Sequence, residues 1–391
     1  MGETSDRAGT EVARRIGVDR VSRVPLATQI SRQLTWLIST GTLEEGALLP
    51  PISDLAAQVG VNTHTMRAAY GQLRDDGLVR MRRGSRTVVL GFDRRQAARA
   101  RERHQSFSIG VLIPSFAAYY DDFLAAVTRA AGAEGWLPII CETHHFDAPV
   151  VSSYLDQLFS RNVDGLIAIH AESPAESEAV DLFGPSDTLR PLVLVDSADL
   201  ATSSQIDVDR ESDGRAAAAH LIEHGHRRVG AVVGPASWIS TQRLLKGHVQ
   251  ALESAGLEPD GDLVANVPDH TLGAGTTAAR RLLALDERPT AVVCAGDVVA
   301  LGVIHGLREA GLRVPQDVAV IGYGDIPFAA TTSPTLTTVR LPAAELGREA
   351  VRALRRAIDE GAPQPPLTVA TSLTLRHSCG CSADAVEESR V

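Results

Sequence analysis

The chain of 391 residues is 44% hydrophobic, 22% charged and 4% aromatic, a composition typical of globular proteins with two or three folding units. No run of about 18 apolar residues occurs, so the sequence pattern excludes a membrane-spanning helix. Residues 1–22 are polar and charged and lack the apolar core of a signal peptide. We therefore expect a disordered N-terminal arm and a cytoplasmic protein.

Charge is distributed unevenly along the chain, whose net value is −10. Residues 1–105 contain 17 arginines and 11 acidic residues, whereas the remainder contains 21 basic and 37 acidic residues. A basic N-terminal part on an acidic body favours a polyanionic partner for the N-terminal part. A solvated basic face with a basic arm explains the same asymmetry, so charge alone leaves both interpretations open.

A helix is predicted near the start of the segment 23–90. It follows Pro25, because proline is favoured in a first turn, and it is expected to end at Gly41. Its apolar residues fall on one face, namely Ile30, Leu34, Leu37 and Ile38. The spacing therefore predicts an amphipathic helix.

Two further helices are predicted in the same segment. The second covers residues 54–59, with Ser53 as its expected N-cap. The third is expected to be capped by Asn62 and ended by Gly77. Its apolar face is formed by Met66, Tyr70 and Leu73. A tight turn over residues 60–62 separates the two helices.

Two strand-like runs, Leu78–Met81 and Thr87–Leu90, enclose an arginine-rich turn. Helix, helix, turn, helix and basic hairpin is the order of a winged helix-turn-helix domain. The third helix would read base edges in the major groove, and the hairpin would contact phosphates or the minor groove. The predicted DNA-contacting residues are Asn62, Thr63, His64, Thr65, Arg67, Arg82, Arg83, Ser85 and Arg86. A winged helix used for protein contacts is the alternative, which a hairpin with three arginines and no acid opposes.

The residues of this segment also follow a family pattern. The matching positions are Pro25-Leu26, Gln29-Ile30, Gly41-Thr42-Leu43, Gly46, Leu49-Pro50, Leu55-Ala56, Gly60-Val61-Asn62, Thr65-Met66-Arg67, Tyr70, Leu73, Gly77-Leu78-Val79 and Arg83-Gly84-Ser85. This pattern resembles the DNA-binding head of the GntR regulators. Two positions depart, because Pro51-Ile52-Ser53 replaces the usual Ser-Glu-Arg and Thr63 replaces a common arginine. Since those arginines often touch DNA, the resemblance implies DNA binding but no particular operator sequence.

Residues 91–106 are polar and arginine-rich and predict a linker. From residue 107, short apolar runs alternate with longer amphipathic segments. The runs are Ile109–Ile113, Leu137–Cys141, Leu166–Ile169, Leu192–Val195, Val229–Val233, Ala291–Ala295 and Val318–Ile321. Such a pattern indicates an α/β fold with doubly wound parallel sheets, and the length favours two lobes. Ligands bind outside the carboxyl ends of such strands, where Asp196, Asp297 and Asp325 occur.

Family-like stretches recur through residues 107–378. They are Ile109-Gly110-Val111-Leu112-Ile113-Pro114, Val163-Asp164-Gly165, His220-Leu221, Gly225-His226-Arg227-Arg228-Val229, Ala300-Leu301-Gly302, Val314-Pro315, Asp317-Val318-Ala319-Val320-Ile321-Gly322-Tyr323 and Pro334-Thr335-Leu336-Thr337-Thr338-Val339. They resemble the sensor domain of the LacI regulators, which is related in fold to periplasmic sugar-binding proteins. The resemblance implies an effector-binding domain in which a small molecule binds between two lobes.

The same resemblance implies an effector site, although the family pattern is less complete there. The matching residues are Tyr119, Tyr120, Arg243, Asp297 and Asp325, and Trp238 could supply the aromatic face that a sugar ring needs. Gly324 stands where many members have a ligand-binding aspartate, and Arg243 lies four residues before Gly247 rather than the usual three. The alternative is structural: Trp238 and Tyr120 pack in the lobe cores, and Asp297 caps the following helix.

The four cysteines divide into two groups. Cys141 and Cys294 lie in apolar runs and are expected to be reduced core residues. Cys379 and Cys381 stand close together at the start of the expected C-terminal tail, residues 379–391, and could bind a metal or form a disulfide. No second Cys/His cluster with zinc spacing accompanies them, and Cys379 also fits the family's usual ending. No metal or cofactor is therefore predicted.

The sequence predicts a transcriptional regulator, most simply a repressor that binds double-stranded operator DNA as a homodimer. Its operator affinity is expected to depend on a sugar or sugar derivative, with a non-sugar metabolite such as a nucleoside as the alternative effector. No membrane partner is expected. A soluble binding protein is opposed by the DNA-binding head. An enzyme is opposed by the lack of a nucleophile elbow, P-loop or dinucleotide motif.

Overall fold

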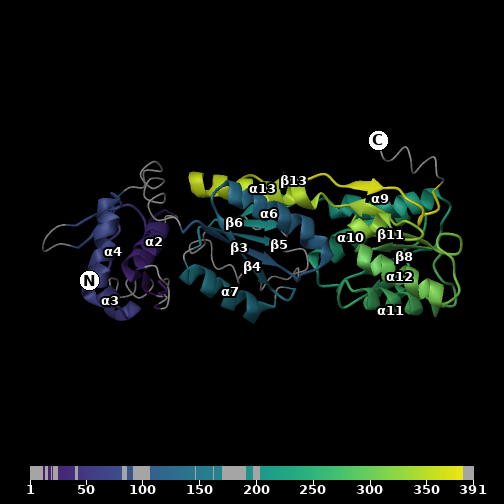
Figure 1. Cartoon of the computed structure of the whole chain (residues 1–391), viewed down its shortest axis with the longest axis horizontal. Coiled ribbons are helices and arrows are strands. Elements are labelled where there is room, and N and C mark those ends of the chain that lie inside the picture. Colours follow the sequence, from purple (N-terminus) through teal and green to yellow (C-terminus); the bar gives the residue numbers. More distant parts are fainter. Residues whose placement is uncertain are drawn as a thin grey trace.

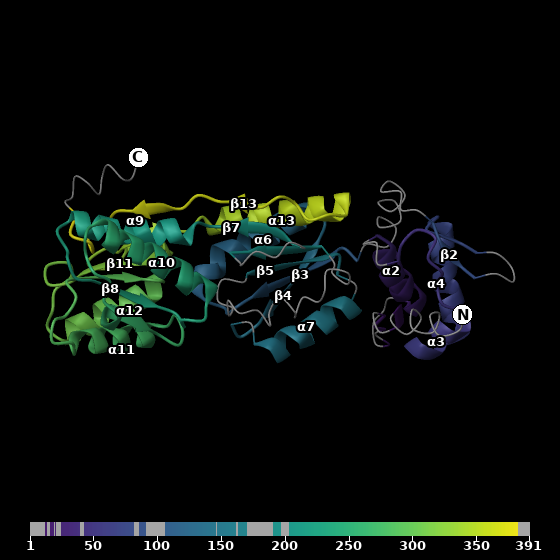
Figure 2. The ribbon, with the colours of Figure 1, turned by 180° about the vertical axis from the view of Figure 1, so that it is seen from behind.

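The computed structural model describes residues 12–13, 16–18, 20, 25–39, 43–81, 86–90, 106–145, 147–161, 163–169, 191–196 and 203–381. A helical head lies at one end of the long axis, followed by two lobes that each contain a sheet (Figure 1). The view from behind shows the same order (Figure 2). Within the described part of the chain, no helix is long and apolar enough to cross a membrane.

The head consists of three helices and a small sheet. These elements are α2 (Leu26–Ser39), α3 (Ile52–Val59), α4 (Thr63–Asp75), and the antiparallel strands β1 (Val79–Arg80) and β2 (Val88–Val89). Their common core contains the side chains that the helical periodicity predicted, including Ile30, Leu34, Met66, Tyr70 and Leu73. This arrangement confirms the winged helix-turn-helix fold of the head.

Of the two helix N-caps predicted in the head, one is confirmed and the other is wrong. Asn62 caps α4, because its side chain accepts a hydrogen bond from the Thr65 amide at 2.7 Å. The prediction that Ser53 caps α3 is wrong. The helix begins at Ile52, directly after Pro51, and the Ser53 hydroxyl donates to the Asp54 carboxylate instead. The predicted helix stop at Gly41 lies outside the described residues.

The first lobe contains a parallel sheet in the order β13-β7-β6-β5-β3-β4. Its strands are β3 (Ser108–Ile113), β4 (Leu137–Glu142), β5 (Gly165–Ile169), β6 (Leu192–Val195), β7 (Ser204–Asp207) and β13 (Leu367–Thr368). Helices α6 (Asp121–Ala133) and α13 (Ala343–Glu360) pack on one face. Helix α7 (Ala148–Ser160) covers the other face. The sheet is therefore buried on both sides, as its apolar strands require.

The second lobe repeats this design with the strand order β14-β12-β11-β10-β8-β9. Its strands are β8 (Val229–Val233), β9 (Val264–Asn266), β10 (Ala291–Cys294), β11 (Ala319–Gly324), β12 (Thr337–Arg340) and β14 (Ser372–Thr374), of which β14 alone is antiparallel. One face carries α9 (Arg210–Glu223) and α10 (Ile239–Ser254), and the other carries α11 (Leu272–Leu283) and α12 (Asp297–Glu309). The two lobes confirm the predicted α/β fold.

Three chain segments join the lobes. The chain passes from β7 to α9, returns from β12 to α13, and passes again from β13 to β14. Short 3₁₀ helices occur at Ala118–Tyr120, Gly261–Leu263 and Pro327–Ala330. Because each lobe has its own sheet and core, the joining segments are where relative motion of the lobes would be absorbed.

Candidate DNA-contacting face and interlobe site

Helix α4 has one buried and one exposed face. Thr63, His64 and Arg67 are exposed, as is Asn62 at the cap, whereas Thr65 is half-buried. The opposite face is fixed in the core, where the buried Tyr70 hydroxyl donates to the Pro50 carbonyl oxygen at 2.8 Å. The first turn contains no acidic residue, so the positive end of the helix dipole is not neutralised. The predicted reading residues therefore lie at the surface of a firmly packed helix.

The arginine-rich hairpin is described only in part. Arg86 is exposed at the base of the hairpin, two residues before β2 begins. Arg82, Arg83 and Ser85 lie outside the described residues. Their contact with DNA stays a prediction from the sequence.

The carboxyl ends of strands in both sheets carry backbone strain. Among the residues that the structure describes, five non-glycine residues have a positive φ, and four of them lie within three residues after a strand: His144, His145, Asp196 and Asp325. Asp and His tolerate this left-handed conformation better than most residues, but it still costs free energy. Strained residues of this kind gather at functional sites, and here they mark the side of each sheet that faces the other lobe.

A buried ion pair joins the two lobes. Arg210, the first residue of α9, donates from Nε to an Asp196 carboxylate oxygen at 2.6 Å and from an Nη atom to the Tyr119 hydroxyl at 2.9 Å. Burial opposes the charge on Arg210, but the Asp196 carboxylate outweighs it and raises the pKa of the guanidinium. The other Asp196 oxygen is buried and accepts no hydrogen bond from any described residue. This oxygen is therefore available to accept a hydrogen bond, next to the Arg210 guanidinium.

Aromatic side chains from the two lobes also contact one another. The indole of Trp238, after β8, stacks on the His145 ring, after β4, with centroids 5.1 Å apart and planes inclined by 27°. The His270 ring meets the same indole edge-on at 5.4 Å. Each of these two groups links the lobes, and we call them together the interlobe cluster: Tyr119, Asp196 and Arg210 in one group, and His145, Trp238 and His270 in the other. It combines flat apolar faces with charged hydrogen-bonding groups.

Four of the predicted effector residues lie between the lobes or beside that region. Tyr119 and Trp238 belong to the cluster itself. Tyr120 is buried and packs edge-on against Tyr119, with ring centroids 4.9 Å apart. Arg243 projects from α10 and forms an ion pair with Asp207, at the end of β7, at 3.0 Å. This pair is a second charged link between the lobes.

The two predicted aspartates are held within the second lobe. Asp297 is 2% exposed and accepts hydrogen bonds from the Ile326 amide at 2.8 Å and the Thr338 hydroxyl at 2.6 Å. Asp325 forms ion pairs with Arg340 and Arg376, at 2.7 and 2.6 Å. Burial raises the pKa of Asp297 to about 6, against the opposing hydrogen bond from Thr338. Both carboxylates already have partners, and a ligand contact at either one stays a prediction.

Sequence reasoning missed several members of the cluster. Arg210 and His270 carry no local sequence signal, and one partner of Arg210, Tyr119, lies 91 residues away along the chain. Asp196 was noticed only as a polar residue after a strand. His145, like Asp196, is a polar residue shortly after an apolar run, so the signal that identified Asp196 could also have identified His145.

A winged head whose helix α4 has an exposed face, followed by two lobes that meet at polar and aromatic contacts, indicates a DNA-binding regulator with a sensor domain. Residues 26–89 match the family described as bacterial regulatory proteins, gntR family, and residues 218–379 match the periplasmic binding protein-like domain. The HTH-type transcriptional repressor PurR of Haemophilus influenzae is 31% identical over 326 residues, covering 80% of this chain and 93% of that protein. The chain belongs to the LacI family of transcription regulators, with a GntR-type head.

Solved structures agree with this assignment. A putative transcriptional regulator of the LacI family from Sanguibacter keddieii has a TM-score of 0.63 and 28% identity, covering 71% of this chain and 100% of that one. The transcriptional regulator CelR in complex with cellobiose has a TM-score of 0.63 and 25% identity, covering 84% of this chain and 99% of that one. These relatives are regulators, which supports a role other than catalysis for this chain.

Proposed function

We propose that this regulator controls transcription through a small molecule, a sugar or sugar derivative, that binds at the interlobe cluster and changes operator affinity. The observation that carries the proposal is the buried Asp196 carboxylate. One of its oxygens pairs with Arg210 from the start of α9, and the other accepts no hydrogen bond from a described residue. A buried acceptor of this kind is costly unless a partner satisfies it. A ligand hydroxyl group is such a partner.

The chemistry of the cluster fits a polyhydroxylated ring. Sugar sites combine an aromatic face for the ring with planar charged groups for the hydroxyl groups. Trp238 supplies the face, while Asp196 and the Arg243–Asp207 pair supply charged groups. Hydrogen bonds to charged groups are stronger than those between neutral groups. One solved relative contains cellobiose, which supports the sugar class.

A nucleoside is the second candidate effector. The Trp238 and His145 rings are inclined by only 27°, and nearly parallel rings from opposite lobes suit a flat base as well as a sugar ring. Asp297 and Asp325 already have partners, which leaves fewer carboxylate oxygens for sugar hydroxyl groups.

The proposed mechanism is closure of the lobes around the effector. Closure alters the contacts between Arg210 and Tyr119 and between Arg243 and Asp207, because each pair spans the two lobes. In a homodimer on a pseudo-palindromic operator, this motion changes the spacing of the two heads. A coupling free energy of about 1–3 kcal/mol would change operator affinity by about 5–150-fold, and release of a repressor is the simplest outcome.

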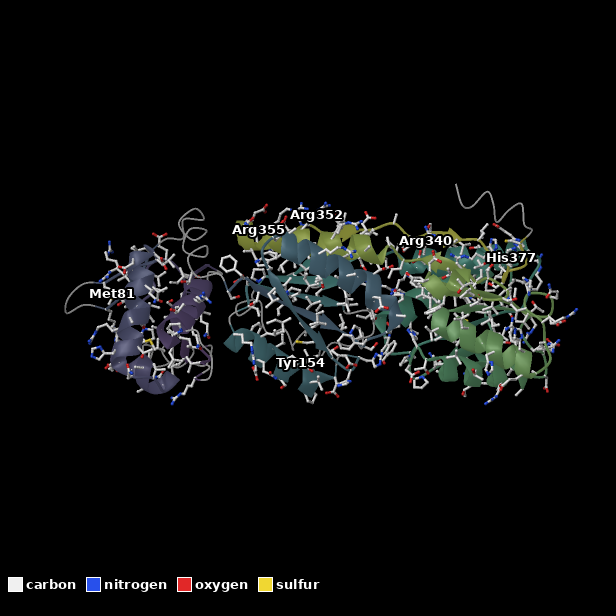
Figure 3. The ribbon with its side chains drawn as sticks, in the orientation of Figure 1. Met81, Tyr154, Arg340, Arg352, Arg355 and His377 are labelled. Carbon is white, nitrogen blue, oxygen red and sulfur yellow. The ribbon has the colours of Figure 1, made fainter. Side chains whose placement is uncertain are left out.

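A thermal-shift screen tests the effector proposal. Sugars including cellobiose, sugar phosphates and nucleosides are added to the full chain, and a ligand is expected to raise the melting temperature by mass action. His145→Ala should abolish the shift, because it removes one face of the aromatic stack at a half-buried position. Tyr154→Ala on α7 is the matched aromatic control and should keep it (Figure 3). A shift that survives His145→Ala would place the ligand elsewhere, and a nucleoside hit would select the second candidate.

A further inference from the structure

Four potential metal ligands come together at the far end of α9 from the interlobe cluster. His220 and His224 are one helical turn apart, so their rings lie on the same face of α9, with centroids 4.3 Å apart. The Cys381 sulfur lies 3.3 Å from His220 Nε2 and 3.5 Å from His224 Nε2. The Cys379 sulfur lies 3.0 Å from that of Cys381. We call these four residues the His–Cys cluster.

The ring of His224 is oriented as a metal ligand requires. Its Nδ1 pairs with the backbone carbonyl oxygen of His220 at 2.9 Å, which makes Nδ1 the protonated nitrogen. The lone pair then belongs to Nε2, the atom that faces the Cys381 sulfur. Metal-binding histidines almost always donate their second ring nitrogen in this way, which fixes both tautomer and ring orientation.

The spacing of the ligand atoms fits a tetrahedral ion. With bonds of about 2.3 Å to sulfur and about 2.0–2.1 Å to nitrogen, tetrahedral zinc holds its sulfur and nitrogen ligands roughly 3.5 Å apart. The two sulfur–nitrogen distances, 3.3 and 3.5 Å, are close to this value. The ligand atoms of His220, His224 and Cys381 all lie within 4.8 Å of one another. Cys379 lies outside this group of three, so its sulfur would have to move away from that of Cys381 and toward the imidazoles to become a fourth ligand.

We propose that the His–Cys cluster is a structural zinc site, with His220, His224 and Cys381 as three ligands and Cys379 as the fourth. Two thiolates and two imidazoles are a ligand set that selects zinc over magnesium or calcium. All four ligands come from the protein, which is typical of a structural site rather than a catalytic one. Binding converts both thiols to thiolates, so two protons are released to solvent for each ion bound.

Burial and access are consistent with metal binding. Cys379 is buried, but His224 is exposed, and Cys381 lines a surface groove of about 530 Å³ that also includes Pro315 and His377. An ion can therefore reach ligands that are otherwise enclosed.

The site would fasten the C-terminal segment to α9. Residues 376–381 already pair with the second lobe through Ser378, whose backbone carbonyl accepts from the Val320 amide and whose hydroxyl accepts from the Thr337 amide. Zinc would add a link from this segment to the last turn of α9. The first residue of the same helix is Arg210, which belongs to the interlobe cluster. The site is thus distinct from the effector site but shares a helix with it.

Cobalt substitution tests the proposal on the full chain, purified with a reductant and stripped by a chelator. One equivalent of Co²⁺ should produce a thiolate-to-cobalt charge-transfer band, and one equivalent of Zn²⁺ should abolish it. Cys381→Ser should remove most of the band. His224→Ala, at an exposed position, should weaken binding by more than the roughly 10–100-fold cost of losing an outer-shell contact. Circular dichroism checks that each variant is folded.

Two substitutions outside the His–Cys cluster serve as matched controls. His305→Ala, which removes an exposed helical histidine of α12, and Cys141→Ser should leave cobalt binding unchanged. Zinc should raise the melting temperature of the wild type and of these controls, but not of Cys381→Ser. Absence of the band in the folded wild type, or an unchanged band in Cys381→Ser, would overturn the site. A Cys379–Cys381 disulfide in the reduced preparation, detected as a mass lower by two hydrogens, would overturn it as well.

Discussion

Asp297 is the first residue of α12, and its buried carboxylate bonds to the Ile326 amide and the Thr338 hydroxyl. Burial is the main cause of its raised pKa, and the nearby Asp325 carboxylate acts in the same direction. The Thr338 hydrogen bond and Arg376 oppose the shift. Asp297 therefore links α12 to the residues after β11 and to β12. Its ionised form costs free energy because the carboxylate is buried away from water.

This cost predicts a pH-dependent effect of Asp297→Asn. A carboxyl with a folded-state pKa of about 6 stabilises the fold when protonated, and this contribution is lost as the pH rises through about 6. Asparagine imitates the protonated form, so the variant should be more stable than wild type at neutral pH, by up to about 3 kcal/mol. Near pH 4 the two should be equal. Urea unfolding across this pH range measures the difference, and a difference that does not vary with pH would contradict the shifted pKa.

Gly324 offers a second residue-scale prediction. Its φ of +128° favours glycine, and a Cβ built there would lie 3.0 Å from Cδ2 of Tyr119 in the other lobe. Gly324→Ala should therefore destabilise the fold by about 1–3 kcal/mol and disturb the Tyr119–Arg210 contact. Gly273→Ala, on an exposed face of α11 with open space around it, is the control and should be neutral or stabilising. Equal melting temperatures for Gly324→Ala and wild type would show that the lobe contact tolerates a side chain.

The same geometry explains why an aspartate at position 324 would be a poor probe of ligand chemistry. Its side chain would strain the backbone and meet Tyr119 before it reached a ligand. The family resemblance identified the missing carboxylate but not the reason, which depends on a residue more than 200 positions away.

At the scale of elements, α4 is the part of the head that the sequence predicted best. Its period of buried residues, its Asn62 cap and the glycine after it are local features, and each has the predicted position. The Ser53 cap was wrong because Pro51 already sets the start of α3, a competition that cap preferences alone do not resolve.

Arg67→Ala should weaken binding to selected DNA by about 1–3 kcal/mol if the exposed arginine reads a base. Arg74→Ala is the control on the same helix, because Arg74 already bonds to Asp75 at 2.7 Å. DNA selected by the wild type from a random pool serves as the probe in fluorescence anisotropy. Equal losses for both variants would mean that α4 contributes general charge and no base reading.

At the scale of the whole molecule, apolar runs predicted the buried central strands but not the more polar ones. Strand β12 reads Thr337-Thr338-Val339-Arg340, and both threonines are fully buried. Their hydroxyl groups are satisfied by Asp297 and by the Arg376 amide, which lie about 40 residues away in sequence. Such partners cannot be read from a local pattern.

The arrangement of the lobes was also beyond the sequence pattern. Helix α13 follows a strand of the second lobe yet packs on the first sheet, so a division of the chain at one boundary fails. The interlobe and His–Cys clusters form only because the chain passes between the lobes. In the His–Cys cluster, for example, His220 and Cys381 are 161 residues apart. The polar strand ends could be predicted, but the residues that they meet could not.

The proposed function requires that an effector at the interlobe cluster and DNA at the head are energetically coupled. Coupling is reciprocal, so a ligand that changes operator affinity by a given factor must have its own affinity changed by DNA to the same extent. The direct measurement is a closed thermodynamic cycle on the full chain. It combines the Kd for selected DNA with and without the screened ligand, and the Kd for the ligand with and without DNA. We predict equal factors of about 5–150 on both sides of the cycle. A ligand that binds the cluster and leaves both constants unchanged would contradict this coupling.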